Sequence, residues 1–314
     1  MSIYLHTFFS ILVLGILIIL VVLFRKKGVL KEENGILFSR LVTQVTLPAL
    51  IFSSLANSTI EWDYILLFLI MLTSELVLFI FAWFIGKSLK LPHKQMGSFL
   101  LVSIFGSSAL LGYAVIIQLF PDNTSALAEG VFISELGVGL PLFTLGVFIA
   151  MYYGKENQKV TAVRDNVLLF FKSPIFIAIV LGVLWSFSPL ETKGLFITPL
   201  FEVIYIIGKA NTFLVALTVG VLLNFSTLSN IVRIAFSAIV LKLIVAPLLV
   251  YFPANILSLE SWQLQVLLLE SSMPSAMLSV VLARQYGCDA KLAAQLVFIT
   301  LVFSLFSVSI MMNL

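Results

Sequence analysis

Charged residues are scarce in this chain: Asp, Glu, Lys and Arg make up 11% of 314 residues, against roughly 25% in an ordinary soluble domain. A single cysteine, Cys288, excludes an internal disulfide and a cysteine-based zinc site. The two histidines, His6 and His93, lie at segment ends and are too few for a histidine metal cluster. No Gly-x-x-x-x-Gly-Lys-[Ser/Thr] loop is found, which argues against nucleotide-driven pumping. We therefore expect no cofactor and no bound metal.

Apolar residues are abundant instead. They make up 61% of the chain, and the mean hydropathy is +1.16. A soluble fold of this size could not bury so much apolar surface, so the composition predicts a polytopic membrane protein within a lipid bilayer. The net charge of +3 then reflects membrane topology, and no nucleic-acid partner is expected. Residues 7–24 resemble a signal peptide, but the basic run Arg25–Lys27 follows them, which favours a retained first helix.

A membrane-spanning helix needs about 20 apolar residues. The sequence therefore predicts an all-α fold with ten transmembrane helices, divided as five plus five. The expected divisions are residues 1–154, a polar cytoplasmic link at 155–166, and residues 167–314. The predicted spans are 7–24, 38–57, 63–86, 95–120, 125–153, 167–187, 197–224, 231–252, 262–285 and 290–313.

Basic residues fall on alternate links of this arrangement. One side carries only Lys193. Because Lys and Arg are enriched in cytoplasmic links, the other side is predicted to be cytoplasmic and both termini extracytoplasmic, in the plasma membrane. Five helices that start outside end inside, so the second repeat must be inverted. The basic residues on the predicted cytoplasmic side are Arg25, Lys26, Lys27, Lys31, Arg40, Lys87, Lys90, Lys94, Lys155, Lys159, Arg164, Arg233, Arg284 and Lys291.

Two spans at matching places in the two halves are interrupted. Pro274 lies in the apolar run 262–283, and a proline removes a backbone donor and clashes with the carbonyl four residues earlier. A Gly/Ser-rich stretch interrupts the run 97–119. Paired breaks of this kind point to a transporter's substrate site, and half-helix N-termini suit an anion. The predicted substrate-binding residues at the breaks are Gly106, Ser107, Ser108, Gly112, Ser271, Ser272, Met273 and Pro274.

The second helix of each half carries an unusually polar stretch. These stretches are Thr43–Ala49, with Pro48, and Lys209–Phe213, with Asn211. We expect Pro48 and Asn211 to line the same cavity as the two breaks.

Ionisable residues inside the spans need a partner or a wet cavity, because a charge at the bilayer centre costs at least about 2.5–3.5 kcal/mol. Glu270 adjoins the second break and is the leading candidate for coupling transport to a proton or ion, with Glu135 and Lys209 as further candidates. Structural pairing, or snorkelling near a helix end, is expected for most of the others. The full set is Glu75, Glu129, Glu135, Lys172, Glu202, Lys209, Lys242 and Glu270.

These motifs resemble those of the prokaryotic auxin efflux carrier family, relatives of the plant PIN carriers. The resemblance covers essentially the whole chain. It is carried by Ser272–Ala276, Val280–Gly287, Ala293-Ala294 and Thr46–Phe52, with Phe105–Gly112 in the first crossover. Ser107 and Ser108 stand where family members often have an asparagine.

The resemblance implies two inverted five-helix repeats with broken, crossing fourth and ninth helices. It further implies a scaffold of helices 1, 2, 6 and 7, a moving transport unit with an elevator mechanism, and a homodimer. Relatives handle small carboxylates such as malate or malonate, or indole-3-acetate, while the more distant bile-acid symporters share the fold and use sodium.

The sequence thus predicts a secondary transporter of a small organic anion, coupled to a proton or sodium ion. Two alternatives are a sodium-coupled symporter of another substrate and a membrane sensor that binds a ligand without moving it. An enzyme is not expected, because a serine nucleophile needs a base within reach and neither histidine lies inside a span.

Overall fold

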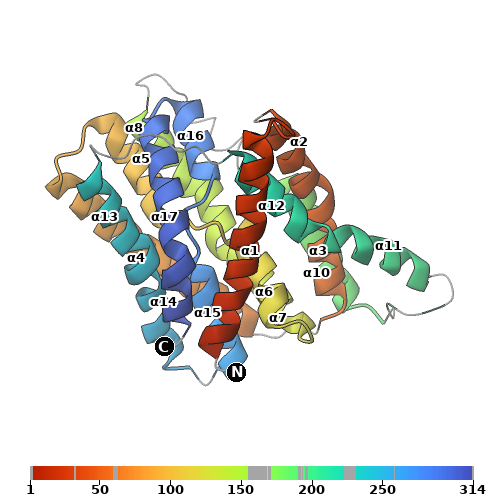
Figure 1. Ribbon diagram of the computed structural model, residues 1–314. Coiled ribbons are helices and arrows are strands. Elements are labelled where there is room, and N and C mark those ends of the chain that lie inside the picture. Colours follow the sequence, from red (N-terminus) through yellow and green to blue (C-terminus); the bar gives the residue numbers. More distant parts are fainter. Residues whose placement is uncertain are drawn as a thin grey trace.

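The computed structural model describes residues 3–31, 33–58, 63–154, 168, 171–189, 192, 194, 197–222, 231–257 and 259–312. The elements within these ranges are helices. The predicted link 155–166 lies outside the described residues. The described helices on either side of it can be followed in Figure 1.

Within the part of the chain that the structure describes, five helical stretches are long and apolar enough to cross a membrane by length and composition. An α-helix rises 1.5 Å per residue, so these stretches of 22 to 29 residues exceed the roughly 30 Å of a hydrocarbon core. Shorter apolar helices are found at Val42–Ala56, Ser108–Leu119 and Pro174–Ser186. The polytopic all-helical membrane protein expected from composition is confirmed. The five long stretches are Asp63–Ser88, Ser125–Tyr153, Ile197–Val221, Val232–Ala254 and Ala290–Met311.

Prolines explain where several spans change from α-helical to π-helical turns. The π-helical segments η1 (Val42–Thr46), η3 (Phe132–Gly139) and η5 (Leu241–Val245) each end two residues before a proline, namely Pro48, Pro141 and Pro247. A proline cannot donate to the carbonyl four residues earlier and its ring crowds that carbonyl. In each case this carbonyl belongs to the π-helical segment, where the wider turn relieves the crowding. Such segments are frequent at functional sites.

The helices pack into two groups (Figure 1). In the first group α10 and α11 pack on α3, while α12 packs on α1 and α2. In this group, η1 joins α2 to α3. The members of the first helix group are α1 (Ile3–Lys26), α2 (Asn34–Leu41), α3 (Leu47–Ala56), α10 (Pro174–Ser186), α11 (Ile197–Lys209) and α12 (Asn211–Leu222).

The second helix group holds the two interrupted spans. Here α4 packs on α5, η3 and α14, and α17 packs on α5, α13, α15 and α16. The two groups meet where α1 contacts α6 and α17 and where α3 contacts α7. The second group comprises α4 (Asp63–Ser88), α5 (His93–Ile104), η2 (Ser108–Gly112), α6 (Tyr113–Leu119), α7 (Thr124–Val131), η3, η4 (Leu142–Gly146), α8 (Val147–Tyr153), α13 (Val232–Val240), η5, α14 (Ala246–Ala254), α15 (Ser261–Ser272), α16 (Leu278–Tyr286) and α17 (Ala290–Met311).

Capping side chains fix the starts of two corresponding helices. The Asn123 side chain accepts a hydrogen bond from the Ala126 amide at 3.2 Å, at the start of α7. The Asp289 side chain accepts one from the Leu292 amide at 3.0 Å, at the start of α17. Asn and Asp are favoured at this position because they satisfy one of the free N–H groups of the first turn. Each half therefore begins its final span in the same way.

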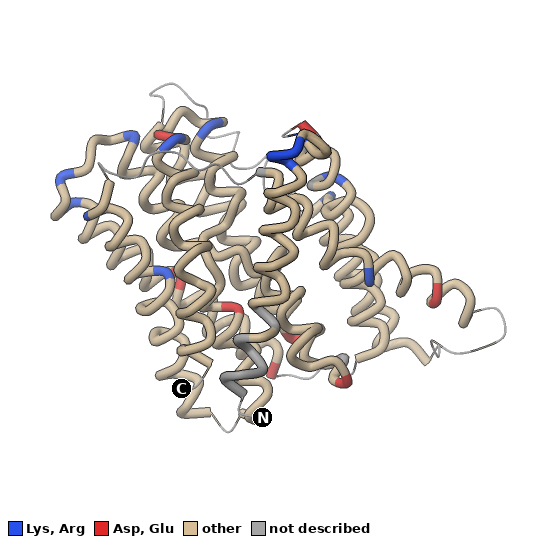
Figure 2. The backbone as a smooth tube through the Cα atoms, in the orientation of Figure 1, with Lys and Arg blue, Asp and Glu red and all other residues tan. Residues whose placement is uncertain are grey.

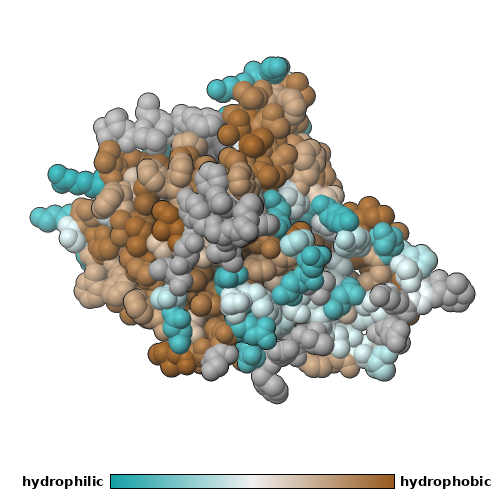
Figure 3. All heavy atoms as spheres, turned by 60° about the horizontal axis from the view of Figure 1, so that its bottom comes forward, coloured by the Kyte–Doolittle hydropathy of each residue, from teal (hydrophilic) through white to brown (hydrophobic). Residues whose placement is uncertain are grey.

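The surface matches a lipid environment. Large apolar side chains are exposed along α1, α4, α10 and α11, and Figure 3 shows broad hydrophobic areas on the flanks. Most lysines and arginines gather at one end, whereas both termini lie at the opposite end (Figure 2). Several acidic residues lie deep between these ends, inside the second helix group.

Candidate functional site: the helix crossing

The two interrupted helices meet at their breaks. The chain becomes extended at Phe105, directly after α5, and at Met273, directly after α15. The Ser107 amide donates to the Pro274 carbonyl at 2.7 Å, and the Ala276 amide donates to the Phe105 carbonyl at 2.9 Å. This is an antiparallel bridge between Gly106 and Ser275. Non-helical backbone at membrane depth has to be satisfied within the protein, and here each break satisfies the other.

Serines next to the second break bond the backbone. The Ser271 and Ser272 hydroxyls both donate to the Leu268 carbonyl, at 2.9 and 2.6 Å. Leu268 lies four residues before the end of α15 at Ser272, so both hydroxyls bond back to the final turn of the helix that stops before Pro274. Thr300 of α17 accepts the Ser275 amide at 3.2 Å. The second break is thus held from both sides.

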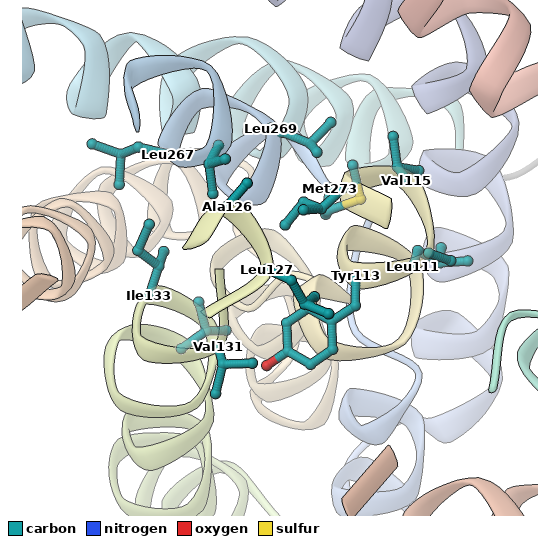
Figure 4. Packing of buried hydrophobic residues seen from close by; sticks show 14 of the residues in the cluster. Leu111, Tyr113, Val115, Ala126, Leu127, Val131, Ile133, Leu267, Leu269 and Met273 are labelled. Atoms are coloured by element: carbon teal, nitrogen blue, oxygen red, sulfur yellow. The ribbon is translucent and has the colours of Figure 1, made fainter. Parts of the chain in front are cut away.

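The first break contacts the neighbouring span through hydroxyls. The hydroxyl oxygens of Ser108 and Ser134 lie 2.7 Å apart. Tyr113 donates from its hydroxyl to Glu135 Oε1 at 2.9 Å. Figure 4 shows the Tyr113 ring beside Leu127 and Val131, with its hydroxyl directed away from the helix that carries it. Glu135 therefore shares a hydrogen bond with the helix that follows the first break.

Glu270 lies fully buried in the last turns of α15. Its carboxyl packs against two glycines: a Cβ added at Gly112 would lie 2.6 Å from both Glu270 oxygens, and one at Gly130 would lie 3.3 Å from Oε1. Gly112 was predicted to bind substrate; its visible effect is to leave room for this carboxyl. Neither Glu270 oxygen has a hydrogen-bond donor among the described residues.

Lys242 was left without a role by the sequence, yet it reaches the crossing. Its ammonium donates to the Ser271 carbonyl at 3.2 Å, and a Cβ added at Gly106 would lie 3.0 Å from Nζ. The charge inside an apolar span was the available signal. Which way the side chain points was not readable, because the span has no polar face.

The polar stretches of the two second helices also meet. Thr46 donates to Asn211 Oδ1 at 2.9 Å, and both side chains are buried. Pro48 is half-buried at the start of α3. Lys209 is different: it is exposed, and its ammonium lies 4.3 Å from the centre of the Tyr205 ring. The coupling role predicted for Lys209 gains no support from this position.

The remaining ionisable residues of the spans divide by exposure. Glu75 and Glu129 are buried, whereas Glu202 and Lys172 are exposed. Across the described ranges, no group of three or more His, Cys, Asp or Glu side chains is placed to hold a metal ion.

A narrow, mainly apolar crevice borders the crossing where the two helix groups meet. It runs between α1 and α17 and reaches Met273 and Pro274. Figure 4 shows Met273 close to Leu111 and Val115, which line the same crevice. The crossing is therefore adjacent to the boundary between the two groups.

A polytopic helical membrane protein with two crossed, interrupted spans belongs to the class of membrane transporters. The model of the membrane transport protein family matches residues 7–312, so the chain belongs to that family, and the resemblance to auxin efflux carriers is confirmed. An uncharacterized transporter of Methanocaldococcus jannaschii is 28% identical over 306 residues, 96% of each chain. One of Methanothermobacter thermautotrophicus is 28% identical over 300 residues, 95% of each chain. The uncharacterized transporter YfdV of Escherichia coli is 24% identical over 271 residues, 83% of this chain and 82% of that protein.

Proposed function

We propose that the chain is a secondary active transporter that moves a small organic anion across the plasma membrane. The observation that carries this proposal is the antiparallel bridge between Gly106 and Ser275. A helical segment starts shortly after each of these residues, at Ser108 and at Leu278, so both helix starts lie near the bridge. The first turn of a helix offers free N–H groups and the positive end of the helix dipole. A carboxylate can be bound there without an arginine.

The proposed architecture is ten spans in two inverted repeats, residues 1–154 and 167–314. Two features support it: each half contributes one strand of the bridge, and each half caps its final span with an Asn or Asp side chain. The basic end of the molecule (Figure 2) is assigned to the cytoplasm by the positive-inside rule, which places both termini outside.

Alternating access is proposed to be a movement of one helix group against the other. The first helix group would be the fixed scaffold, and the second, which carries the crossing and the buried carboxyls, would carry the substrate. The division of the packing into two groups supports this assignment, since few elements connect them. The crevice at Met273 and Pro274 lies on that boundary, where substrate enters from one side at a time.

Substrate contacts are assigned to the predicted residues at the two breaks, with Pro48 and Asn211 facing them from the first helix group. Glu270 is assigned to coupling because its fully buried carboxyl abuts the first break at Gly112. Glu135, bonded to Tyr113 directly after that break, is its proposed partner.

The test is flux into proteoliposomes of labelled malate, malonate and indole-3-acetate, with an imposed pH gradient, sodium gradient or membrane potential. We expect carboxylate flux that is driven by protons or potential, lost in Pro274→Ala and Ser272→Ala, and independent of external pH in Glu270→Gln. Retained pH dependence in Glu270→Gln would refute the assignment of Glu270.

Binding without flux would identify a sensor instead of a transporter. A thermal-shift screen against mono- and dicarboxylates, with and without sodium, measures that binding, because a ligand of the folded state raises the unfolding temperature. Flux of a cationic or neutral compound driven by sodium would refute the anion assignment and favour a sodium-coupled symporter.

A further inference from the structure

Acidic groups outnumber basic ones in the buried part of the second helix group. Among the described residues, four carboxyls are buried there, those of Glu75, Glu129, Glu135 and Glu270, and the buried ammonium is that of Lys242. An uncompensated charge in a dry interior is costly, so buried charges are paired or neutralised. Lys242 is therefore central to the charge balance of the crossing.

Lys242 lies where its span departs from regular α-helical geometry. Lys242 lies in the π-helical segment η5, which ends two residues before Pro247. The ammonium reaches the Ser271 carbonyl, in the last turn of α15, and a helix C-terminus favours a cation because its dipole ends negative there.

The first break makes room for the ammonium. A Cβ at Gly106 would lie 3.0 Å from Nζ and 3.1 Å from Cε of Lys242. The ammonium also interacts electrostatically with Glu75 on α4 and with Glu270 on α15. The Glu75 oxygens have no hydrogen-bond donor among the described residues. Lys242 thus lies beside the first break and the end of α15 and interacts electrostatically with Glu75 of α4.

Lys242 is buried inside the second helix group and is not part of the crevice lining. The segment η5 packs against α4, α5, α15 and α17, all members of that group, and Lys242 does not line the crevice at Met273 and Pro274. The Lys242 ammonium bonds a carbonyl and interacts electrostatically with carboxyls. Carbonyl and carboxylate oxygens are also the ligands that hard cations prefer, and unwound carbonyls hold sodium in other transporters.

We propose that Lys242 is a tethered counter-cation: its ammonium takes the place beside the crossing that an exchangeable inorganic cation would otherwise fill. It is a positioning residue, which holds the end of α15 and balances Glu75, and it removes the requirement for sodium. The statement about sodium rests on the proposed transport function, but the role of Lys242 in balancing the buried carboxyls can be tested without a substrate.

The experiment compares purified wild type, Lys242→Ala and the control Lys209→Met in sodium chloride and in N-methyl-D-glucamine chloride at equal ionic strength. Lys209 is a matched control because it also lies in a span but is exposed. We expect wild type and Lys209→Met to unfold at the same temperature in both salts. In N-methyl-D-glucamine chloride, Lys242→Ala should unfold about 5 °C or more below wild type. In sodium chloride this difference from wild type should be smaller, because the vacated site can then bind a sodium ion.

A second pair of variants protects the test against a failure to fold. Lys242→Met leaves Glu75 without its counter-charge, and adding Glu75→Gln removes the charge that was left. The double variant is expected to unfold at a higher temperature than Lys242→Met alone. Equal unfolding temperatures in these two variants would overturn the proposal, as would a sodium response in wild type equal to that of Lys242→Ala.

Flux of malonate separates this inference from the proposed function. If wild type transports malonate without sodium and Lys242→Ala does so only with sodium, both stand. If no carboxylate is transported but the sodium response and the double variant behave as expected, the substrate assignment fails and the counter-cation assignment remains. If malonate is transported and Lys242→Ala shows no sodium response, the counter-cation assignment fails alone.

Discussion

Replacing Gly112 with alanine tests the packing of Glu270 at the crossing. The added Cβ would lie 2.6 Å from both carboxyl oxygens and 2.8 Å from Cδ of Glu270. Non-bonded atoms are most stable at about 3.5–4.0 Å, so the carboxyl has to move by about 1 Å. Gly130 borders it on another side, and its own Cβ would be 3.3 Å from Oε1. The carboxyl therefore has little free space to move into.

The cost follows from this crowding. Overpacking a filled interior typically costs about 1–3 kcal/mol. With an unfolding entropy of about 2.1 cal/mol/K per residue, each 1 kcal/mol lowers the unfolding temperature of a chain of 314 residues by about 1.5 °C. We expect Gly112→Ala to unfold about 1–5 °C below wild type in a thermal-shift measurement on purified protein. Adding Glu270→Ala removes the carboxyl and should relieve the effect of the added methyl group, so the two substitutions should not be additive.

The control for this measurement is Gly15→Ala in α1. Its Cβ would lie 3.6 Å from Leu305 Cδ2, an ordinary contact, so no loss from crowding is expected. If Gly112→Ala unfolds at the same temperature as Gly15→Ala, then Glu270 does not pack against the first break, and the reasoning that couples it to substrate binding is wrong.

Two further predictions concern other parts of the chain. Thr46→Val removes the donor to Asn211 Oδ1 and leaves a buried acceptor unpaired, which should lower the free energy of unfolding by about 1–3 kcal/mol. The control is Thr73→Val, at an exposed position whose hydroxyl bonds only its own helix among the described contacts, and it should change the unfolding temperature little. Equal effects of the two substitutions would contradict the prediction. Burial raises the pKa of Cys288, in the link between α16 and α17, to about 11, so at pH 8 only about one thiol in a thousand is ionised. Iodoacetamide should therefore modify Cys288 slowly in the folded protein and quickly after unfolding, and fast modification of folded protein would refute this.

The breaks were predictable because they depend on local chemistry. Pro274 removes a backbone donor beside Ser271 and Ser272, whose hydroxyls can bond the backbone, and the Gly/Ser run at Phe105–Gly112 disfavours a continuous helix inside an apolar span. The polar stretches of the two second helices meet at Thr46 and Asn211, whereas the substrate cavity that Pro48 and Asn211 are expected to line stays a prediction. These features come from residue type and spacing alone.

The direction of side chains on apolar spans was not predictable. Lys209 and Lys242 are both lysines within apolar spans, and the sequence favoured Lys209 for coupling, yet Lys209 is exposed and Lys242 is buried at the crossing. A helix that is apolar on all sides has no hydrophobic stripe to orient it. Lys242 also lies in a π-helical segment, whose turns depart from the α-helical period, so its direction could not be derived from that period.

The bridge between Gly106 and Ser275 has a consequence for biosynthesis. The two residues are about 170 positions apart, so the first break enters the bilayer long before its partner has been translated. Until then the Phe105 carbonyl and the Ser107 amide lack the groups that bond them in the finished protein, and unsatisfied backbone in lipid is costly. The early half must wait in a shielded or partly hydrated form, and a ribosome stalled before α15 would release a chain suited to quality-control proteases.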